Sequence, residues 1–160
     1  MIEIHPAADA DREWIGDLLA QWWGSPAIVT RGRVHDALAL PGFVACCDGA
    51  RAGLATYEIA GDQCELVSLN STREGQGVGS ALVEAVIAAA REARCSRVWL
   101  ITTNDNLSAL RFHQKRGFHL VAVHRDALDV SRRLKPEIPL IGMEGIPLRD
   151  EIELELDLRL

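Results

Sequence analysis

Apolar side chains recur along this chain with two different spacings, which predict both helices and strands. Helical spacing is clearest in the segment that follows Gly79, where one face carries Leu82, Val83, Val86, Ile87 and Ala90. Strict alternation is clearest near the C-terminus, where one face carries Ile152, Leu154, Leu156, Leu158 and Leu160. We expect this last strand to pack its apolar face on the core and to turn its charged face toward water.

The remaining pattern predicts a series of short elements. Residues 97–103 are apolar on both faces, which is typical of a buried central strand. A helix is expected over about 9–23, with Trp22 on its buried face, and Asn104 or Asp105 is expected to cap another helix. Further strands are expected at residues 1–5, 43–47, 51–59, 64–69 and 118–123.

Three segments are less regular. Residues 28–34 are ambiguous, and residues 35–40 are compatible with a short helix. Residues 125–150 form a connection far longer than the roughly 4–6 residues that are usual between elements. This connection carries three prolines, which restrict the unfolded chain. We therefore expect an ordered lid or functional loop, and the alternative is a solvated excursion.

The predicted order of elements indicates an α/β fold. The strand at 64–69, the following helix and the strand at 97–103 form one right-handed crossover, which makes the two strands parallel. A chain of 160 residues with 48% hydrophobic residues can fill one core, so we expect a single domain over residues 1–160.

Composition excludes several classes of protein. A net charge of −6 argues against a nucleic-acid surface. The chain lacks an apolar run of about 18 residues and a signal-like N-terminus, so we expect a cytoplasmic protein that does not bind membranes. Four cysteines without Cys-x-x-Cys spacing predict reduced thiols, and we predict no metal site.

Three alternating glycines carry the strongest chemical signal. Gly75, Gly77 and Gly79 lie between a predicted strand and a predicted helix. Glycines let a ligand approach the backbone, and the start of a helix offers free N–H groups and a positive dipole end, which together favour a phosphate. The spacing differs from Gly-x-Gly-x-x-Gly, and the Lys-Ser/Thr of a P-loop is absent.

Two segments resemble the GCN5-related N-acetyltransferase (GNAT) superfamily. Residues 74–79 resemble its acyl-CoA loop, Arg/Gln-x-x-Gly-x-Gly/Ala, although Glu74 stands where the family has Arg or Gln. Residues 106–118 resemble its Asn-x-x-Ala-x-x-Phe-Tyr-x-x-x-Gly-Phe pattern. The resemblance implies a mixed, mostly antiparallel sheet with a splayed parallel strand pair flanked by helices. It also implies an acyl-CoA core over about 54–124 and an acceptor-side loop over 125–150.

The resemblance implies that acetyl-CoA is the cosubstrate. Backbone groups of the strand before the glycines would bind the pantetheine arm and polarise the acetyl carbonyl. The implied acyl-CoA contacts are Val67, Leu69, Glu74, Gly75, Gln76, Gly77, Val78, Gly79, Ser80, Asn106, Ala109 and Phe112. The alternatives are that the strand residues are ordinary core, that the glycines serve turn geometry alone and that Asn106 starts a helix.

Proton handling requires further groups. His113 stands where the family has a tyrosine thought to protonate the CoA thiolate, and the alternative is a partly exposed helix histidine without chemistry. Glu65 is the leading candidate for the base and Glu58 the second, although each is equally a solvated charge on a sheet. Trp23 is a candidate for lining the acceptor cavity. The other histidines show no pairing in the sequence, and we assign no role to His5, His35, His119 and His124.

These residues predict transfer of an acetyl group to a primary amine by direct attack in a ternary complex. The acceptor is a small molecule or a peptide, and a homodimer is possible. The alternative, which Glu74 and His113 leave open, is a non-catalytic acyl-CoA-binding sensor or assembly module.

Overall fold

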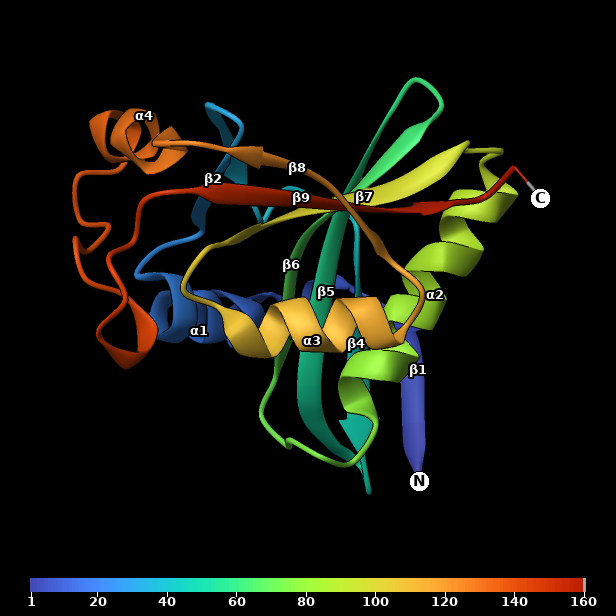
Figure 1. Ribbon diagram of the computed structural model, residues 1–160. Coiled ribbons are helices and arrows are strands. Elements are labelled where there is room, and N and C mark those ends of the chain that lie inside the picture. Colours follow the sequence, from blue (N-terminus) through green and yellow to red (C-terminus); the bar gives the residue numbers. More distant parts are fainter. Residues whose placement is uncertain (160) are drawn as a thin grey trace.

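A seven-stranded mixed sheet organises the computed structural model, which describes residues 1–159 (Figure 1). Its strands, in spatial order, are β1 (Ile2–Pro6), β4 (Gly42–Cys47), β5 (Ala50–Ala60), β6 (Gln63–Ser71), β7 (Arg97–Thr103), β9 (Glu151–Asp157) and β8 (His119–His124). All neighbouring strands pair antiparallel except β6 and β7, which are parallel. The α/β class and the parallel pair predicted from sequence are confirmed.

The parallel pair separates after only three residue pairs. The last matched pair is Glu65 with Trp99, and within the described residues β6 has no β7 partner from Leu66 to Ser71. Figure 1 shows β4, β5 and β6 running down the view while β7, β9 and β8 cross it. The splayed pair implied by the resemblance is therefore present, and it leaves backbone groups of β6 free to bind a ligand.

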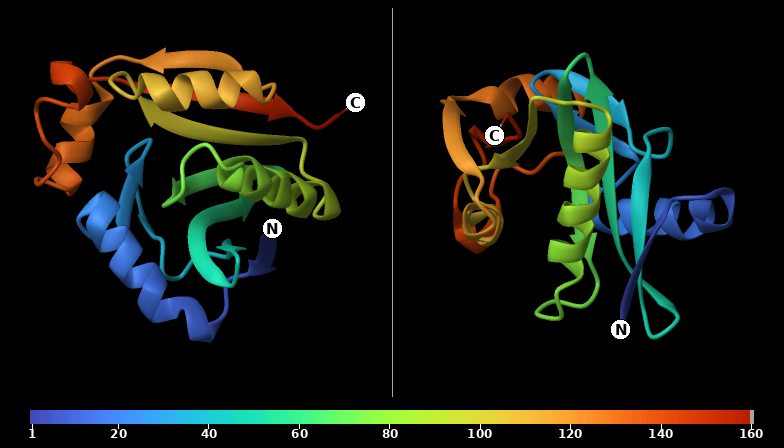
Figure 2. Two further views of the ribbon diagram at one scale, coloured as in Figure 1. Left: turned by 90° about the horizontal axis from the view of Figure 1, so that it is seen from below. Right: turned by 90° about the vertical axis from the view of Figure 1, so that its right-hand side faces the viewer.

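Helices cover both faces of the strands β4 to β6 (Figure 2). Helix α2 (Val78–Glu92) packs its apolar stripe on one face, as the helical spacing predicted. Helix α1 (Arg12–Trp23) packs on the other face with Leu18, Leu19 and their neighbours, and Gly24 ends it in a left-handed conformation. Helix α3 (Leu107–Lys115) and helix α4 (Ala127–Leu134) follow β7 and β8.

Three local predictions were wrong. Trp22, expected in the core, is 49% exposed. Residues 27–36 form a separate hairpin of β2 (Ala27–Thr30) and β3 (Arg33–Asp36), so residues 35–40 are not a helix. The charged face of β9 does not simply meet water, because Glu151 is buried and its carboxylate accepts hydrogen bonds from the backbone N–H of Arg31.

Two further features depart from simple alternation. A β-bulge in the β5–β6 pairing places Val67 among the side chains near α1, whereas Leu69 packs on the α2 side. Alternation alone had put both on one face. Leu160, the last residue of the predicted C-terminal strand, lies outside the described residues.

The long connection from 125 to 150 is ordered, and it contains α4 and a 3-10 turn at Met143–Gly145. Asn104 holds its end, since the Asn104 side-chain amide donates to the carbonyl of Pro147 and accepts from the N–H of Asp150. The buried Lys135 ammonium donates to the carbonyls of Trp23 and Ala27, at 2.6 Å each. These contacts fasten the connection to α1 and to β2.

The structure also describes the state of the cysteines and the length of the helices. The four cysteines are all free, and three of them are buried. None of the helices in the described residues is long and apolar enough to span a bilayer.

Candidate active site

A groove lies at the splayed edge of β6, between the glycine loop, the start of α2 and helix α3. Ten of the residues predicted from sequence line it: Leu69, Glu74, Gly75, Gly77, Val78, Gly79, Ser80, Ala109, Phe112 and His113. The exposed side of Trp22 lines the same groove, so the tryptophan that was expected in the core instead borders the site.

Three predicted contacts have other surroundings. Val67 is buried in the cluster beneath α1. Gln76 is exposed at the tip of the glycine loop. Asn106, rather than Asn104 or Asp105, caps α3, because its side-chain oxygen accepts a hydrogen bond from the N–H of Ala109 at 3.1 Å. The helix-start role considered for Asn106 is thus confirmed, and its contact with pantetheine stays a prediction.

Each of the three glycines has a conformational or steric reason of its own. Gly75 and Gly77 have φ values of +75° and +83°, a region that side chains disfavour. A Cβ at Gly79 would lie 3.1 Å from the ring of Phe112. Glycine spacing alone therefore does not require a ligand, and the case for one rests on the groove and on the helix start that the loop presents.

Arg116 joins the two walls of this groove and was missed as a site residue. Its Nε donates to the Ser80 hydroxyl at 2.8 Å, its Nη1 donates to the Phe112 carbonyl at 2.8 Å, and its guanidinium lies 3.6 Å from the centre of the Phe112 ring. In the sequence its only apparent role is to complement the C-terminal dipole of α3. A basic residue directly before the Gly-Phe dipeptide was the available signal, because it places a positive charge beside the glycine loop, for which we predicted a phosphate ligand.

His113 lies at the base of the groove and is buried rather than partly exposed. Its ring meets Phe112 and Phe118 edge-on, and its Nδ1 atom is buried without a hydrogen-bond partner in the described part of the chain. Burial, together with the nearby charge of Arg116, lowers the pKa of His113 to about 4. The ring is therefore neutral at pH 7 and carries a single N–H.

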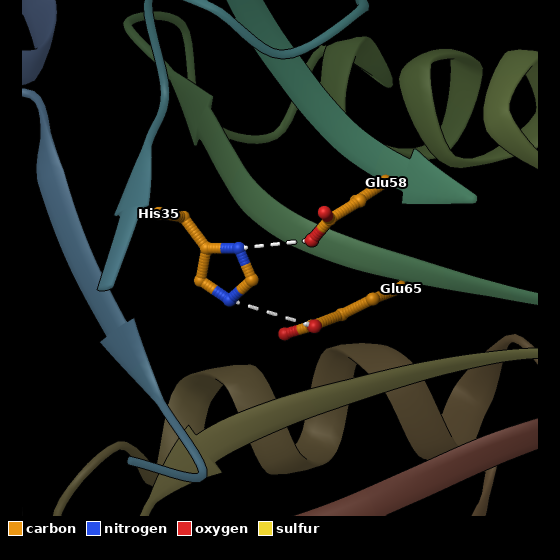
Figure 3. Close-up of side chains that lie close together, drawn as sticks. All are labelled: His35, Glu58 and Glu65. Carbon is orange, nitrogen blue, oxygen red and sulfur yellow. Dashed lines mark ion pairs between the residues drawn. The ribbon is translucent and has the colours of Figure 1, made fainter. Parts of the chain in front are cut away.

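A second cluster of polar side chains lies where β6 and β7 separate (Figure 3). Glu65 of β6, Glu58 of β5 and His35 of β3 point toward one another. His35 Nδ1 lies 3.1 Å from Glu58 Oε2, and His35 Nε2 lies 3.6 Å from Glu65 Oε1. The hydroxyl of Thr30 lies 2.7 Å from Glu65 Oε2 and 2.8 Å from His35 Nε2.

The sequence-based statement that the histidines show no pairing was wrong for three of them. His35 contacts Glu58, His5 Nε2 lies 3.1 Å from Asp11, and His124 Nε2 lies 3.1 Å from Glu153. All of these pairs join segments that local pattern reading treats separately, so spacing could not reveal them.

Burial sets the protonation of the cluster. Burial, assisted by the charge of Glu58 and opposed by the Thr30 hydrogen bond, raises the pKa of Glu65 to about 7. Burial also lowers the pKa of His35, against the opposite effect of Glu58. Glu65 is thus a buried carboxyl that changes charge near neutral pH, which is what a general base requires.

The same three side chains offer donor atoms that lie within 4.8 Å of one another, a spacing that would admit a cation. The Thr30 hydroxyl, however, already engages both Glu65 and His35. We therefore interpret the cluster as a hydrogen-bonded chain rather than as a set of metal ligands.

The cluster and the groove share one strand. Glu65 and Leu69 are four residues apart on β6, which corresponds to roughly 13 Å. Trp23 lies near this stretch, because its Nε1 donates to the side-chain oxygen of Asn70 at 3.0 Å. Trp23 is 36% exposed, and its role in lining an acceptor cavity stays a prediction.

Two known proteins are similar in sequence to nearly the whole chain. The chain is 41% identical to YdhI of Bacillus subtilis over 153 residues, covering 95% of this chain and 96% of the relative. It is 37% identical to YxbD of the same organism over 159 residues, covering 99% and 100%. Both relatives are named as uncharacterized proteins.

Solved structures share the fold. A Bacillus subtilis acetyltransferase in complex with CoA matches with a TM-score of 0.72 at 19% identity, covering 99% of each chain. YncA of Salmonella typhimurium, a putative acetyltransferase with acetyl-CoA, matches with a TM-score of 0.71 at 20% identity, covering 98% of this chain and 94% of that one.

A family model extends this likeness to sequence. The model described as "Acetyltransferase (GNAT) family" matches residues 10–118, which include the glycine loop, α3 and the Glu65 cluster. This match covers more than half of the chain, and the protein therefore belongs to the GNAT acetyltransferase family.

Proposed function

We propose that this protein transfers the acetyl group of acetyl-CoA to a primary amine by direct attack in a ternary complex. The observation that carries the proposal is the position of Glu65, a buried carboxyl with a pKa of about 7 at the point where β6 leaves β7. A protein that only sensed acyl-CoA would gain nothing from burying such a group, whereas an amine acceptor must lose a proton.

Acetyl-CoA would occupy the groove. The pyrophosphate would bind the N–H groups of the glycine loop and the first turn of α2, where the helix dipole favours negative charge. The pantetheine arm would pair with the free edge of β6 near Val67 and Leu69, and an N–H group there would polarise the acetyl carbonyl. Free thiols and the use of acetyl-CoA support a cytoplasmic setting.

The acceptor would reach the other end of the splayed edge. The hairpin β2–β3, the Trp23 side chain and the connection 125–150 surround that end, and the Lys135 hydrogen bonds hold them together. We propose that these segments select a small-molecule or peptide amine.

In the reaction, the neutral amine attacks the carbonyl carbon, the C–N bond forms and the C–S bond breaks. Glu65 accepts the proton that the amine loses. The departing CoA thiolate needs a proton or a hydrogen bond. His113, with a pKa of about 4, is a poor proton donor at pH 7, and we propose that it assists through the N–H of its neutral ring.

The proposal is tested with acetyl-CoA and a panel of amines: a polyamine, a lysine peptide, a peptide with a free N-terminus and an aminoglycoside. We expect CoA to bind in calorimetry and free thiol to appear with at least one class of acceptor. A ligand at 100 times its Kd also adds about 2.7 kcal/mol to the free energy of unfolding. Failure of CoA to bind would refute the cosubstrate, and binding without turnover across the panel would favour the sensor.

A further inference from the structure

Four side chains form a continuous polar chain from the interior to the surface. Glu65, Thr30 and His35 are buried, whereas the Glu58 side chain is 27% exposed. Successive polar atoms lie 2.7, 2.8 and 3.1 Å apart. Thr30 and His35 lie on the hairpin β2–β3, and their side chains insert between the two glutamates of the large sheet. The hairpin therefore supplies the two groups that link Glu65 to Glu58.

The chain can hold its protons in two arrangements. When Glu65 is protonated, its O–H donates to Thr30, the Thr30 hydroxyl donates to His35 Nε2, and His35 Nδ1–H donates to Glu58. When Glu65 is ionised and Glu58 is protonated, every one of these hydrogen bonds reverses its direction. Both arrangements contain the same number of protons, and in both each atom along the path has a hydrogen-bond partner once the Glu58 carboxyl group turns slightly toward His35.

We propose that Thr30, His35 and Glu58 form a proton relay that carries the proton taken up by Glu65 to the surface. This inference rests on the proposed role of Glu65 as the base. In one passage Glu65 gives its proton to Thr30, Thr30 gives its own to His35 Nε2, and Nδ1 gives its proton to Glu58, which releases it to water. Counting the release to water, four O–H or N–H bonds break and four form, and the net change is one proton moved outward.

The relay explains an otherwise unsatisfied atom. Glu58 Oε2 is buried and makes no hydrogen bond with any described residue, although His35 Nδ1 lies 3.1 Å from it. A proton on either atom, with a small rotation of the carboxyl group, completes the bond. After products leave, Glu58 takes a proton back from water and the three transfers run in reverse, which returns the ring to its Nδ1–H form and protonates Glu65. Water entering the open acceptor site then takes the proton from Glu65.

Neighbouring charges influence which end of the chain holds the proton before transfer. The Arg33 guanidinium lies 3.1 Å from Glu58 Oε1 at the outer end. At the inner end, the charge of Glu151 acts on Glu65, and Glu151 is itself held by Arg31. The charges of Glu58 and Glu151 raise the pKa of Glu65 and the charge of Arg33 lowers it, so the neighbouring acids favour the starting arrangement, in which Glu65 holds the proton.

The decisive variant is Glu58→Gln. Removing the Glu58 charge makes Glu65 easier to ionise, so a purely electrostatic role predicts equal or faster turnover at pH 6. The relay predicts a lower kcat, on the order of 10²-fold, with the Kd for CoA unchanged. His35→Gln should lower kcat similarly, and the double variant should be no slower than the slower single variant, because both cut the same chain. Additive losses, or a faster Glu58→Gln enzyme, would overturn the relay.

Two conservative substitutions of Thr30 test its hydroxyl group directly. Thr30→Val removes the hydroxyl at constant volume, and Thr30→Ser restores it. We expect the loss of kcat in Thr30→Val to persist at pH 9, where Glu65 is ionised with or without its hydrogen bond, and to be largely recovered in Thr30→Ser. A defect that disappears at pH 9 would mean that Thr30 only tunes Glu65. His124→Gln, which breaks a histidine–glutamate contact between β8 and β9, is the matched control.

A measurement without CoA or acceptor separates the relay from the proposed function. In ¹⁵N NMR of the free protein at pH 6, the relay predicts a neutral His35 with its proton on Nδ1. The ring should also report a titration near pH 7 that disappears in Glu65→Gln. A proton on Nε2 at pH 6, or no response to Glu65, would refute the chain even if the enzyme is active. An inactive enzyme with the expected ring signals would refute only the function.

Discussion

Replacing Glu65 by glutamine should both stop catalysis and stabilise the folded protein above neutral pH. The glutamine resembles the protonated carboxyl in shape and charge, so it can keep a hydrogen bond with Thr30 but cannot accept a proton. We expect kcat to fall by about 10²–10⁴-fold, as for other general bases. In the wild-type protein, kcat/KM should rise with pH up to about 7, because only the ionised Glu65 accepts the amine proton.

The stabilisation follows from proton linkage. The pKa of Glu65 is raised from its ordinary value of 4.5 to about 7 in the folded state. Between these values the folded state holds a proton that the unfolded state has lost, so stability falls as pH rises. At about 1.4 kcal/mol per pKa unit, this loss reaches about 3 kcal/mol by pH 8. Glu65→Gln removes it, and relative to wild type the variant should gain stability between pH 5 and pH 8.

Urea unfolding at pH 5 and pH 8 measures this difference. Glu153→Gln is the control. Burial of Glu153 would raise its pKa, but the hydrogen bonds from Arg97 and His124 lower it below the ordinary value. Its stabilising effect is therefore lost only as pH falls below about 4.5, and its ΔΔG should be the same at pH 5 and pH 8. If Glu65→Gln also shows the same ΔΔG at both pH values, Glu65 does not carry the raised pKa on which the mechanism depends.

Three further changes test other parts of the site. Glu74→Gln should tighten CoA binding about fivefold, because a unit charge pair at roughly 8 Å in water is worth about 0.5 kcal/mol and a pyrophosphate carries two charges. Calorimetry measures the Kd, and Glu84→Gln at an exposed position on α2 is the control. His113→Phe should change kcat by less than about tenfold at pH 7, and a loss of 10²-fold or more would restore the general-acid role. Lys135→Met should lower the free energy of unfolding by about 3 kcal/mol, since two buried carbonyls lose a charged donor. It should also raise the acceptor KM without changing the Kd for CoA. An unchanged KM would show that the connection 125–150 does not contribute to acceptor binding.

The fold was largely predictable because its elements carry local signals. The apolar stripe of α2, the doubly apolar β7 and the Asp48-Gly49 turn between β4 and β5 each depend on neighbours in sequence. The errors arose where tertiary contacts override local pattern. Trp22 follows the helical stripe but borders a groove, and Glu151 alternates like a surface residue but is buried against the backbone of Arg31.

The two halves of the site differed in predictability for the same reason. The glycine loop and α3 are contiguous motifs, so their spacing places them together. The chain from Glu65 to Glu58 passes through Thr30 and His35, which lie 35 and 30 residues before Glu65 on a hairpin that has no clear pattern. Its distances exist only after the hairpin packs on β6, and one sequence does not encode that packing in any local spacing.

His113 and Glu65 change the free energy of unfolding in opposite directions as pH rises, so their effects cancel in the wild-type protein. His113, with a pKa lowered from 6.5 to about 4, binds its proton more weakly in the folded state, so stability rises by about 3 kcal/mol as pH increases through that range. Glu65 lowers stability by a similar amount between pH 4.5 and about 7. Because these ranges overlap, the wild-type free energy of unfolding should change little from pH 4.5 to 6.5. His113→Phe should therefore uncover a decline over this range and Glu65→Gln a rise, and a flat profile in both variants would show that neither group is perturbed.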